Sequence, residues 1–309
     1  MNLSKEIKSY ALELGFDIVK IIPAISLKKD GEYLQKWLSE GFSADLNYMK
    51  KYPEKRYNPG QNLNNAKSII CLAINYYQPL PEEKNKNYGI VARYAWGRDY
   101  HKTIEKKLKK LRKFIIEKSG ASLKDFKLYS DAGPVLDRAY AAKAGIGFVG
   151  KNTSLITKEY GSWIFLAEII SDLKLEYDNP DNKFIGSCGS CKKCIESCPT
   201  KALVAPYTLD ANKCISYQTI ENRKKIPPQI RSKMKNRIFG CDICQEVCPH
   251  NLRAKTTKEN DFLNHISGPY LDLKKLKDIT EQEFNKKYSG SPVKRPGYKG
   301  IIRNIKHML

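Results

Sequence analysis

In the first 175 positions, segments with hydrophobic residues at helical spacing alternate with short continuous hydrophobic runs. Apolar side chains that recur at helical spacing predict three amphipathic helices, over residues 5–14, 27–41 and 100–119. Short apolar runs predict strands at residues 17–22, 68–76, 126–129, 155–157 and 163–170. A further helix is expected over residues 134–144, with Pro134 at its first position and Gly145 as its stop. Strands that alternate with helices in this way predict an α/β domain.

Eight of the nine cysteines form two groups with the spacing of a two-cluster ferredoxin. The first group has the pattern C-x2-C-x2-C-x3-C-P and consists of Cys188, Cys191, Cys194 and Cys198. The second consists of Cys214 and, after a long gap, Cys241, Cys244 and Cys248, again followed by proline. In proteins of this type the last cysteine of the run ligates the other cluster. We therefore predict one [4Fe–4S] cluster on Cys188, Cys191, Cys194 and Cys248, and a second on Cys198, Cys214, Cys241 and Cys244.

Zinc and disulfide bonds are the alternatives for these cysteines. Zinc ribbons use paired C-x2-C motifs but rarely the run that ends in Cys-Pro, which occurs twice here. Disulfides need an oxidising compartment, whereas Lys5 and Lys8 interrupt any apolar segment typical of a signal peptide. We therefore expect iron–sulfur clusters in a cytoplasmic protein. Cys71 lies in an apolar run and is expected to be a buried strand cysteine.

These patterns predict three segments. An α/β domain is expected over residues 1–175, followed by a ferredoxin-like two-cluster domain over residues 176–252. The polar stretch 176–182 is expected to be the linker, and a basic insertion at 216–240 separates the second cysteine group. Residues 253–309 form a basic tail, with a helix expected at 281–287.

The net charge of the chain is strongly positive. Its 309 residues include 55 lysines and arginines against 33 acidic residues, a formal net charge of +22. Two oxidised clusters, each with a charge of about −2, would still leave a large positive excess. This excess favours a polyanionic partner, nucleic acid first, against the alternative of solvated charge in a lysine-rich chain. No run of 18 apolar residues occurs, so no membrane partner is expected.

Two basic segments bracket the cluster cysteines. The insertion contains Arg223, Lys224, Lys225, Arg231, Lys233, Lys235 and Arg237. The tail contains Lys294, Arg295, Lys299, Arg303 and Lys306, with Tyr298 among them. Basic side chains contact phosphates, and tyrosine and arginine stack on unpaired bases. Each segment taken alone is also compatible with a solvated surface.

Several motifs resemble those of the epoxyqueuosine reductases. The most specific are SDAGPVLDR at residues 130–138 and KAGIGFVGKN at residues 143–152. RYAWGRDYH at 93–101, GSW at 161–163 and SYQTIENR at 216–223 are similar to that family as well, as is the double cysteine motif. The resemblance covers nearly the whole chain and is to the short form of the family, which lacks further helical repeats.

The resemblance implies a cobalamin-dependent oxidoreductase that reduces epoxyqueuosine at the wobble position of tRNA to queuosine. It implies an α/β (α+β) cobalamin-binding domain related to that of reductive dehalogenases, followed by the ferredoxin-like domain. Electrons from a low-potential donor, whose identity stays open, would pass through the clusters to cobalamin. We expect a monomer that binds the anticodon stem-loop carrying epoxyqueuosine.

The same resemblance implies roles for individual residues. Asp131 would contact the cofactor and donate a proton to the opening epoxide, which requires burial of its carboxyl against cofactor and substrate. The alternative for Asp131 is a turn or capping residue ahead of the helix at Pro134. Further cobalamin contacts are expected from Arg56, Ala95, Lys151, Asn152, Ser154, Leu155 and Ser216. Contacts with tRNA are expected from Gln218, Glu221, Arg223, Lys294, Arg295 and Lys299.

Two other functions remain as alternatives. The first is a reductive dehalogenase-like or flavin-fed oxidoreductase that acts on a small molecule, although such a substrate does not call for two basic segments. The second is a ferredoxin-type electron carrier, which would leave the α/β domain without a role.

Overall fold

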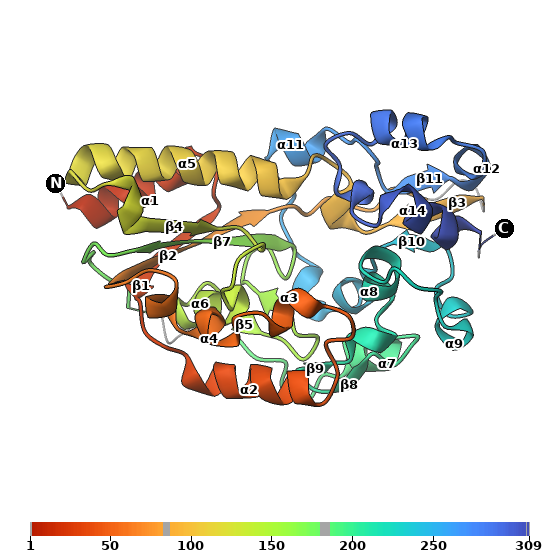
Figure 1. The fold of residues 1–309 in the computed structure, drawn as a ribbon, viewed down its shortest axis with the longest axis horizontal. Coiled ribbons are helices and arrows are strands. Elements are labelled where there is room, and N and C mark those ends of the chain that lie inside the picture. The colour runs from red at the N-terminus through yellow and green to blue at the C-terminus, as the bar shows by residue number, and fades with distance from the viewer. Residues whose placement is uncertain (1, 83–86, 180–185, 307, 309) are drawn as a thin grey trace.

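Two β-sheets organise the structure, a computed structural model that describes residues 2–82, 87–179, 186–306 and 308. Figure 1 shows the larger sheet in the N-terminal half, on the left, and the smaller sheet among the C-terminal helices on the right. The segment with the cluster cysteines, in green and cyan, lies below the smaller sheet in this view. The result is a mixed α/β fold, as predicted.

The larger sheet has four strands in the order β1-β2-β7-β4, and every neighbouring pair is antiparallel. The strands are β1 (Ile18–Pro23), β2 (Ser68–Asn75), β7 (Ile164–Ser171) and β4 (Phe126–Tyr129). The central strands β2 and β7 are buried at nearly every position, because both faces of the sheet are covered. The four predicted strands are confirmed, with ends that differ by no more than one residue. Cys71 is fully buried in β2, as expected.

Helices cover the two faces of this sheet (Figure 1). On one face, α1 (Leu3–Glu13) and α5 (Tyr100–Ser119) pack apolar side chains onto β2 and β7. The other face carries α6 (Asp137–Lys143), with α2 (Lys28–Ser39), α3 (Asn47–Lys50) and α4 (Pro53–Tyr57) further out. The predicted helix α5 is confirmed at both ends, where Asp99 caps its start and Gly120 has a left-handed φ of 71°.

The prediction of a helix that begins at Pro134 was wrong. Helix α6 begins at Asp137, and Pro134 lies in the irregular segment before it. Tertiary hydrogen bonds hold that segment outside the helix. The backbone N–H of Leu136 donates to the carbonyl oxygen of Arg56 (2.7 Å), and the Pro134 carbonyl accepts from the Asn62 side chain (3.3 Å). Proline is compatible with a first helical turn, but here these contacts decide its conformation.

The smaller sheet combines three short strands that are far apart in sequence. β3 (Tyr88–Val91) pairs in parallel with β10 (Arg237–Phe239) and antiparallel with β11 (Tyr270–Asp272). Each strand comes from a different predicted segment of the chain. The boundaries at 175 and 252 stay predictions, and the linker expected at 176–182 lies partly outside the described residues.

C-terminal helices pack on the smaller sheet. They are α11 (Asn260–Leu263), α12 (Leu273–Lys277), α13 (Glu281–Lys287) and α14 (Gly297–Ile305). Large side chains such as Trp96, Phe239 and Phe284 form the core between sheet and helices. The helix predicted at 281–287 is confirmed as α13.

The cysteine-rich segment consists of short elements. Its helices are α7 (Lys193–Ser197), α8 (Ile215–Ile220), α9 (Pro228–Arg231) and α10 (Ile243–Glu246). Two small hairpins accompany them, β5 (Phe148–Val149) with β6 (Leu155–Ile156), and β8 (Leu203–Ala205) with β9 (Thr208–Leu209). β6 matches the predicted strand at 155–157 within one residue. No helix in the described ranges has the length and apolar composition needed to cross a membrane.

Candidate active site and cysteine sets

Four cysteines from two segments line one small cavity. Cys188 and Cys191 come from the loop that leads into α7, Cys194 lies in α7 itself, and Cys248 follows α10. We call these four the first cysteine set. Lys151, Asn152 and His250 complete the walls of the cavity. The structure thus brings together the four cysteines whose grouping the spacing predicts.

The other four cysteines form a second cysteine set, which consists of Cys198, Cys214, Cys241 and Cys244. Burial raises the pKa of the Cys244 thiol well above its ordinary value, and the nearby charges of Cys241, Cys214 and Cys198 raise it further. Burial also raises the pKa of Cys241 to about 12. Cys244 therefore lies within electrostatic reach of the other three cysteines, and all four residues are half-buried.

Backbone amides point at sulfur atoms in both sets. The N–H of Lys151 donates to Cys188 Sγ (3.4 Å), and the N–H of Ala202 donates to Cys198 Sγ (3.2 Å). Four thiols with N–H donors around them are the ligand environment of a [4Fe–4S] cluster, where such hydrogen bonds also tune the reduction potential. The donor atoms of both sets fit that cofactor.

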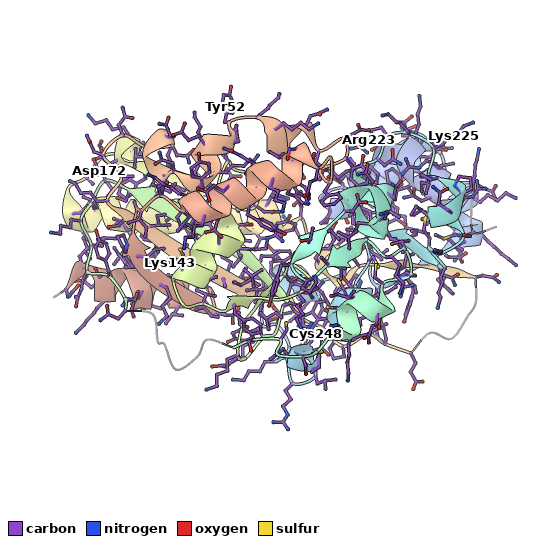
Figure 2. All side chains as sticks on the ribbon, turned by 90° about the horizontal axis from the view of Figure 1, so that it is seen from below. Tyr52, Lys143, Asp172, Arg223, Lys225 and Cys248 are labelled. Carbon is purple, nitrogen blue, oxygen red and sulfur yellow. The ribbon has the colours of Figure 1, made fainter. Side chains whose placement is uncertain are left out.

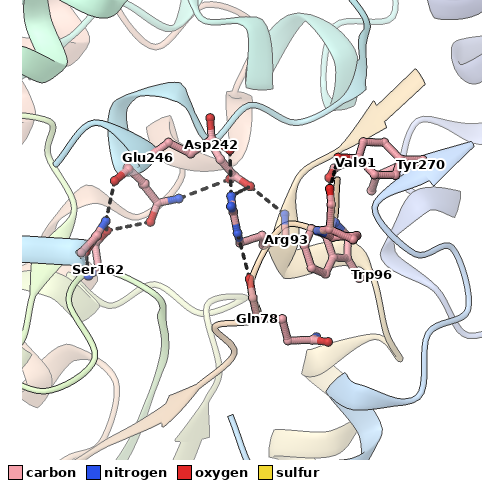
Figure 3. A network of polar contacts seen from close by, with 11 residues as sticks. Gln78, Val91, Arg93, Trp96, Ser162, Asp242, Glu246 and Tyr270 are labelled. Carbon is pink, nitrogen blue, oxygen red and sulfur yellow. Dashed lines mark hydrogen bonds and ion pairs between the residues drawn. The ribbon is translucent and has the colours of Figure 1, made fainter. Parts of the chain in front are cut away.

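A buried ion-pair network connects the second cysteine set to the smaller sheet (Figure 3). Arg93 donates from its backbone N–H to the carboxylate of Asp242 (2.7 Å), and its guanidinium contacts Asp242 (3.5 Å) and Glu246 (2.9 Å). Burial raises the pKa of Asp242 to about 6, while Arg93 opposes that shift. Asp242 lies between the ligand candidates Cys241 and Cys244. Arg93 therefore fixes the loop of the second set against the segment that contains Ala95.

Asp131 forms the centre of a separate polar cluster. It follows β4 and has a positive φ of 60°, which is rare for a residue with a side chain. The hydroxyl of Tyr100 donates a hydrogen bond to its carboxylate. Nε2 of His101 lies 4.0 Å from the same carboxylate, and Nδ1 of His101 lies 2.8 Å from Asp99 Oδ1. The cluster therefore places one hydroxyl group and one imidazole ring beside the Asp131 carboxylate.

The expected environment of Asp131 was only partly correct. It does not precede a helix directly, because α6 begins six residues later. Its side chain is 55% exposed in the protein alone, so any burial has to come from a bound partner. The ring of Tyr100 stacks on Phe165 at 4.0 Å and on His101 at 4.0 Å. Burial, followed by the charge of Asp131, raises the pKa of Tyr100, which keeps its hydroxyl protonated as a donor.

Residues from both ends of the chain meet opposite Asp131. Burial raises the pKa of Tyr48, the charges of Glu221 and Asp131 raise it further, and Arg295 and Arg56 oppose them. These charged groups therefore lie within electrostatic reach of the Tyr48 hydroxyl. Glu221 and Arg295 form an ion pair across two segments, with Nε 3.0 Å from Oε1. The N-terminal half and the basic tail thus contribute to one surface around Asp131.

A second acid lies beneath Asp131 in the sheet. Glu168 in β7 is 1% exposed, and within the described part of the chain neither carboxylate oxygen has a hydrogen-bond partner. Burial raises its pKa well above the ordinary value, and the charges of Asp137 and Asp131 add to that shift. The sequence analysis did not identify Glu168. A single acidic residue in the apolar run 164–170 was the signal that could have found it.

The predicted cobalamin contacts lie at several places. Arg56 is 7% exposed and donates to the carbonyl oxygens of Tyr48 (2.5 Å) and Gly133 (3.4 Å), beside Asp131. Its Nε is buried and has no hydrogen-bond partner among the described residues. Asn152 donates to the Cys244 carbonyl oxygen (3.4 Å) and accepts from the N–H of Ser154 (3.2 Å).

The other predicted contacts are interior or close to the cysteines. The side chains of Ala95 and Leu155 are fully or almost fully buried. Ser216 lies in α8, two residues after Cys214 of the second set, and its backbone N–H, after that of Tyr217, opposes the rise that burial causes in the pKa of the Cys214 thiol. Lys151 contacts the first set. The unpartnered Arg56 Nε beside Asp131 is the observation that fits a large polar cofactor there.

The structure gathers most of the predicted tRNA contacts on one surface. Arg223 donates to the carbonyl oxygen of Arg295 (2.9 Å), next to Glu221 and Lys294, and Lys299 is exposed on α14. Figure 2 shows Arg223 and Lys225 at the periphery of this half of the molecule.

Gln218 lies elsewhere, in the interior. It is 3% exposed, donates to the Asn212 carbonyl oxygen (2.6 Å) and accepts from Asn222 (2.6 Å). Two tail residues are also structural, since Tyr298 donates to the Ile279 carbonyl (3.0 Å) and Arg303 donates to the carbonyl of Asn222 (2.6 Å). In this conformation the side chain of Gln218 supports α8 and does not face solvent.

Two protein families match this sequence. Residues 187–251 match a 4Fe-4S double cluster binding domain, and residues 56–132 match the family described as epoxyqueuosine reductase QueG, DUF1730. The first match spans all eight cysteines of the two sets.

Full-length relatives are similar along the whole chain. Epoxyqueuosine reductase of Atelocyanobacterium thalassa is 39% identical over 100% of both chains. The enzyme of Cellulophaga algicola is 42% identical over 97% of this chain and 95% of its own. The structure of epoxyqueuosine reductase from Streptococcus thermophilus superposes with a TM-score of 0.89 at 31% identity, covering 100% of this chain and 81% of that one. A crystal structure of epoxyqueuosine reductase with an epoxyqueuosine-modified tRNA stem loop gives a TM-score of 0.88 at 34% identity, over 99% of this chain and 80% of that one.

Proposed function

Because this chain belongs to the epoxyqueuosine reductase family, we propose that it reduces epoxyqueuosine in the anticodon stem-loop of tRNA to queuosine. Its electrons would pass through two [4Fe–4S] clusters to cobalamin, and Asp131 would donate a proton. Opening the epoxide to the alkene consumes two electrons and two protons and releases one water. The site therefore has to supply both electrons and protons to one substrate group.

One observation carries this proposal: groups from both halves of the chain converge around an accessible carboxylate. Asp131 and Tyr100 come from the N-terminal half with the larger sheet, while Glu221 comes from the basic insertion at 216–240 and Arg295 from the basic tail. A nucleotide held by the basic surface would lie within reach of the carboxylate. A small-molecule enzyme or a simple electron carrier has no need of that juxtaposition.

Cobalamin would supply low-valent cobalt, a strong reductant, when it is bound near Asp131. Arg56 would hold it through the unpartnered Nε, and Asn152, Ser154 and Ser216 would hold polar groups near the cysteine sets. The second set, next to Ser216 and Asn152, would then be the one closer to the cofactor.

Asp131 would transfer its proton from the carboxyl group to the epoxide oxygen. The Tyr100 hydroxyl orients that carboxyl, and His101, paired with Asp99, is placed to return a proton to it. Bound cofactor and nucleoside would cover the exposed side of Asp131 and remove water from it, which favours its protonated form.

The direct test uses the full chain, reconstituted anaerobically with iron, sulfide and cobalamin. With a chemical low-potential reductant, it should convert epoxyqueuosine-containing tRNA to queuosine, as measured by mass spectrometry of the digested nucleosides. Omission of cobalamin should abolish product while both clusters remain. Product formation at full rate without cobalamin would overturn the cofactor assignment.

The tRNA surface is tested through its charge. Lys294→Glu should weaken tRNA binding by about tenfold or more at moderate salt and reduce the salt dependence of binding, because one phosphate contact is lost. Lys143→Glu is the matched control: Lys143 is exposed at the end of α6, in the other half of the molecule (Figure 2). Equal losses in both variants would mean that the excess charge acts without a defined surface.

A further inference from the structure

We infer that Lys151 is a built-in counter-charge for the cluster of the first cysteine set, and that it makes this cluster easier to reduce. Its role would be electrostatic, and it would act on the cluster without ligating it. The inference rests on a [4Fe–4S] cluster in this set and does not depend on the substrate.

The Lys151 side chain is directed into the loop that carries the first set. It is 8% exposed, and its Nζ donates to the carbonyl oxygens of Gly189 (2.6 Å) and Cys191 (3.0 Å). The backbone N–H of the same residue donates to Cys188 Sγ (3.4 Å). One residue thus contacts the ligand loop at three points and lines the cavity between the four thiols.

The charge of this ammonium group lacks a conventional partner. Among the described residues, no carboxylate forms an ion pair with Lys151, and its two acceptors are neutral carbonyl groups. An ammonium removed from water without an opposite charge is strongly unfavourable. A cluster with four thiolates carries a charge of about −2 and would supply the missing negative charge at that position.

The direction of the effect follows from electrostatics. Reduction adds one electron and makes the cluster more negative, so a nearby fixed positive charge stabilises the reduced form more than the oxidised form. Lys151 therefore raises the reduction potential of the first cluster. Water screens a charge at the surface, so an exposed lysine at the same cavity has a smaller effect.

The chain offers a matched control for that argument. Lys193 lines the same cavity, but it is exposed. We compare Lys151→Met and Lys193→Met, each of which removes one positive charge. Lys151→Gln keeps a donor for one carbonyl without the charge, and Lys151→Arg keeps the charge.

The measurement is a redox titration of the reconstituted full-length protein, followed by electron paramagnetic resonance. The signal that is lost from Cys188→Ala identifies the first cluster. In Lys151→Met and Lys151→Gln, the ratio of reduced to oxidised first cluster at a fixed potential should fall by about tenfold, or about 59 mV for one electron. Lys193→Met should shift it by less than about threefold, and Lys151→Arg should stay close to the parent.

Each outcome decides the inference. If assembled Lys151→Met and Lys151→Gln titrate like the parent, or if Lys193→Met shifts the first cluster equally, the inference is wrong. If both neutral variants lose the iron of the first cluster and Lys151→Arg retains it, the counter-charge is required for assembly and the inference stands. If Lys151→Met, Lys151→Gln and Lys151→Arg all lose that iron, the protein needs the shape of the lysine side chain and not its charge, and the inference fails. The premise that two clusters are present is tested independently, because the parent protein should then contain about eight irons per chain.

Discussion

The carboxyl groups near the cysteine sets and those of the Asp131 cluster differ in their partners. Near the cysteines, two buried carboxylates have a cationic partner: Asp242 pairs with Arg93, and Asp210 pairs with Lys213 at 3.1 Å. In the Asp131 cluster, Asp131 and Glu168 have no lysine or arginine partner among the described residues. Glu168 has no hydrogen bond in the described part of the chain, and Asp131 is held by a neutral hydroxyl.

This difference matches the chemistry proposed for each region. A fixed cation such as Arg93 favours the ionised form of a buried carboxylate, which suits a structural charge beside groups that hold electrons. A buried carboxyl group without a cation, such as Glu168, favours its protonated form, which suits a site that consumes protons.

Removal of one ligand should abolish electron delivery. Cys188→Ala should lower the iron content from about eight to about four per chain and eliminate turnover, because one cluster is lost. Cys71→Ala, in the buried strand β2, should keep about eight irons and lose only stability. Iron and sulfide analysis beside a turnover assay measures this. A Cys188→Ala variant with full iron content would break the assignment of the first set.

Asp131→Asn removes the transferable proton but keeps the shape of the side chain. Turnover of epoxyqueuosine-containing tRNA should fall by about 10²–10⁴-fold, the usual effect of losing a positioned acid. Both clusters should remain intact. Asp172→Asn, at a distant position labelled in Figure 2, should turn over normally. Single-turnover rates together with a thermal melt distinguish this from a capping role, in which stability would fall by about 1 kcal/mol and the rate would persist.

The paired region is tested through Arg93. Arg93→Gln leaves Asp242 buried without its cation and should destabilise the protein by about 3–5 kcal/mol. Arg98→Gln is the comparison, because Arg98 pairs with Asp261 at 3.6 Å on the surface, with 58% of its side chain exposed. Its loss should cost about 0–1 kcal/mol. The unfolding midpoints of the two variants measure this difference in stability. Similar midpoints would show that the ion pair of Arg93 with Asp242 does not stabilise the fold.

The unpaired region is tested through the pH dependence of Glu168→Gln. Burial raises the pKa of Glu168 in the folded protein, so its contribution to stability is present below the unfolded pKa and is lost as the pH rises toward the folded pKa. Glutamine does not titrate. The stability of the variant relative to the parent should therefore grow by about 1.4 kcal/mol per pH unit above pH ~4.5. Melting curves between pH 5 and 8 would show a constant difference if Glu168 were ionised.

Local sequence patterns predicted the elements that bury one continuous face. The termini of α5 and β4 were predicted to the residue, because periodicity, an apolar run and Gly120 mark them within a few positions. The grouping of the eight cysteines could also be predicted, because the spacing of the ligands along the chain indicates which cysteines belong together. The same applies to α13, which begins with a capping box at Thr280.

Other features depend on contacts that a linear pattern does not contain. β3 is short and pairs with strands far away in sequence, so nothing in its own residues marks it as a strand. The start of α6 moved because a hydrogen bond from Leu136 to Arg56 outweighed the preference of Pro134 for a first helical turn. Gln218 is interior because Asn212 and Asn222 occupy its amide. For β3 and α6 a partner distant in sequence decided the outcome, and for Gln218 the side-chain and carbonyl contacts of its neighbours did.

The smaller sheet also sets the order in which this protein is completed during synthesis. β3 meets its last partner, β11, only after about 180 further residues have been made. At about 5–20 residues per second, that takes roughly 9–36 s. For most of this interval the segment after β3, including Arg93 and Ala95, has no Asp242 to pair with, and the C-terminal helices α12–α14 follow only after β11. Cys188 likewise waits for Cys248. If the first cluster binds this set, its insertion has to wait until about 60 residues beyond Cys188 have been made, and the nascent chain carries open thiols until then.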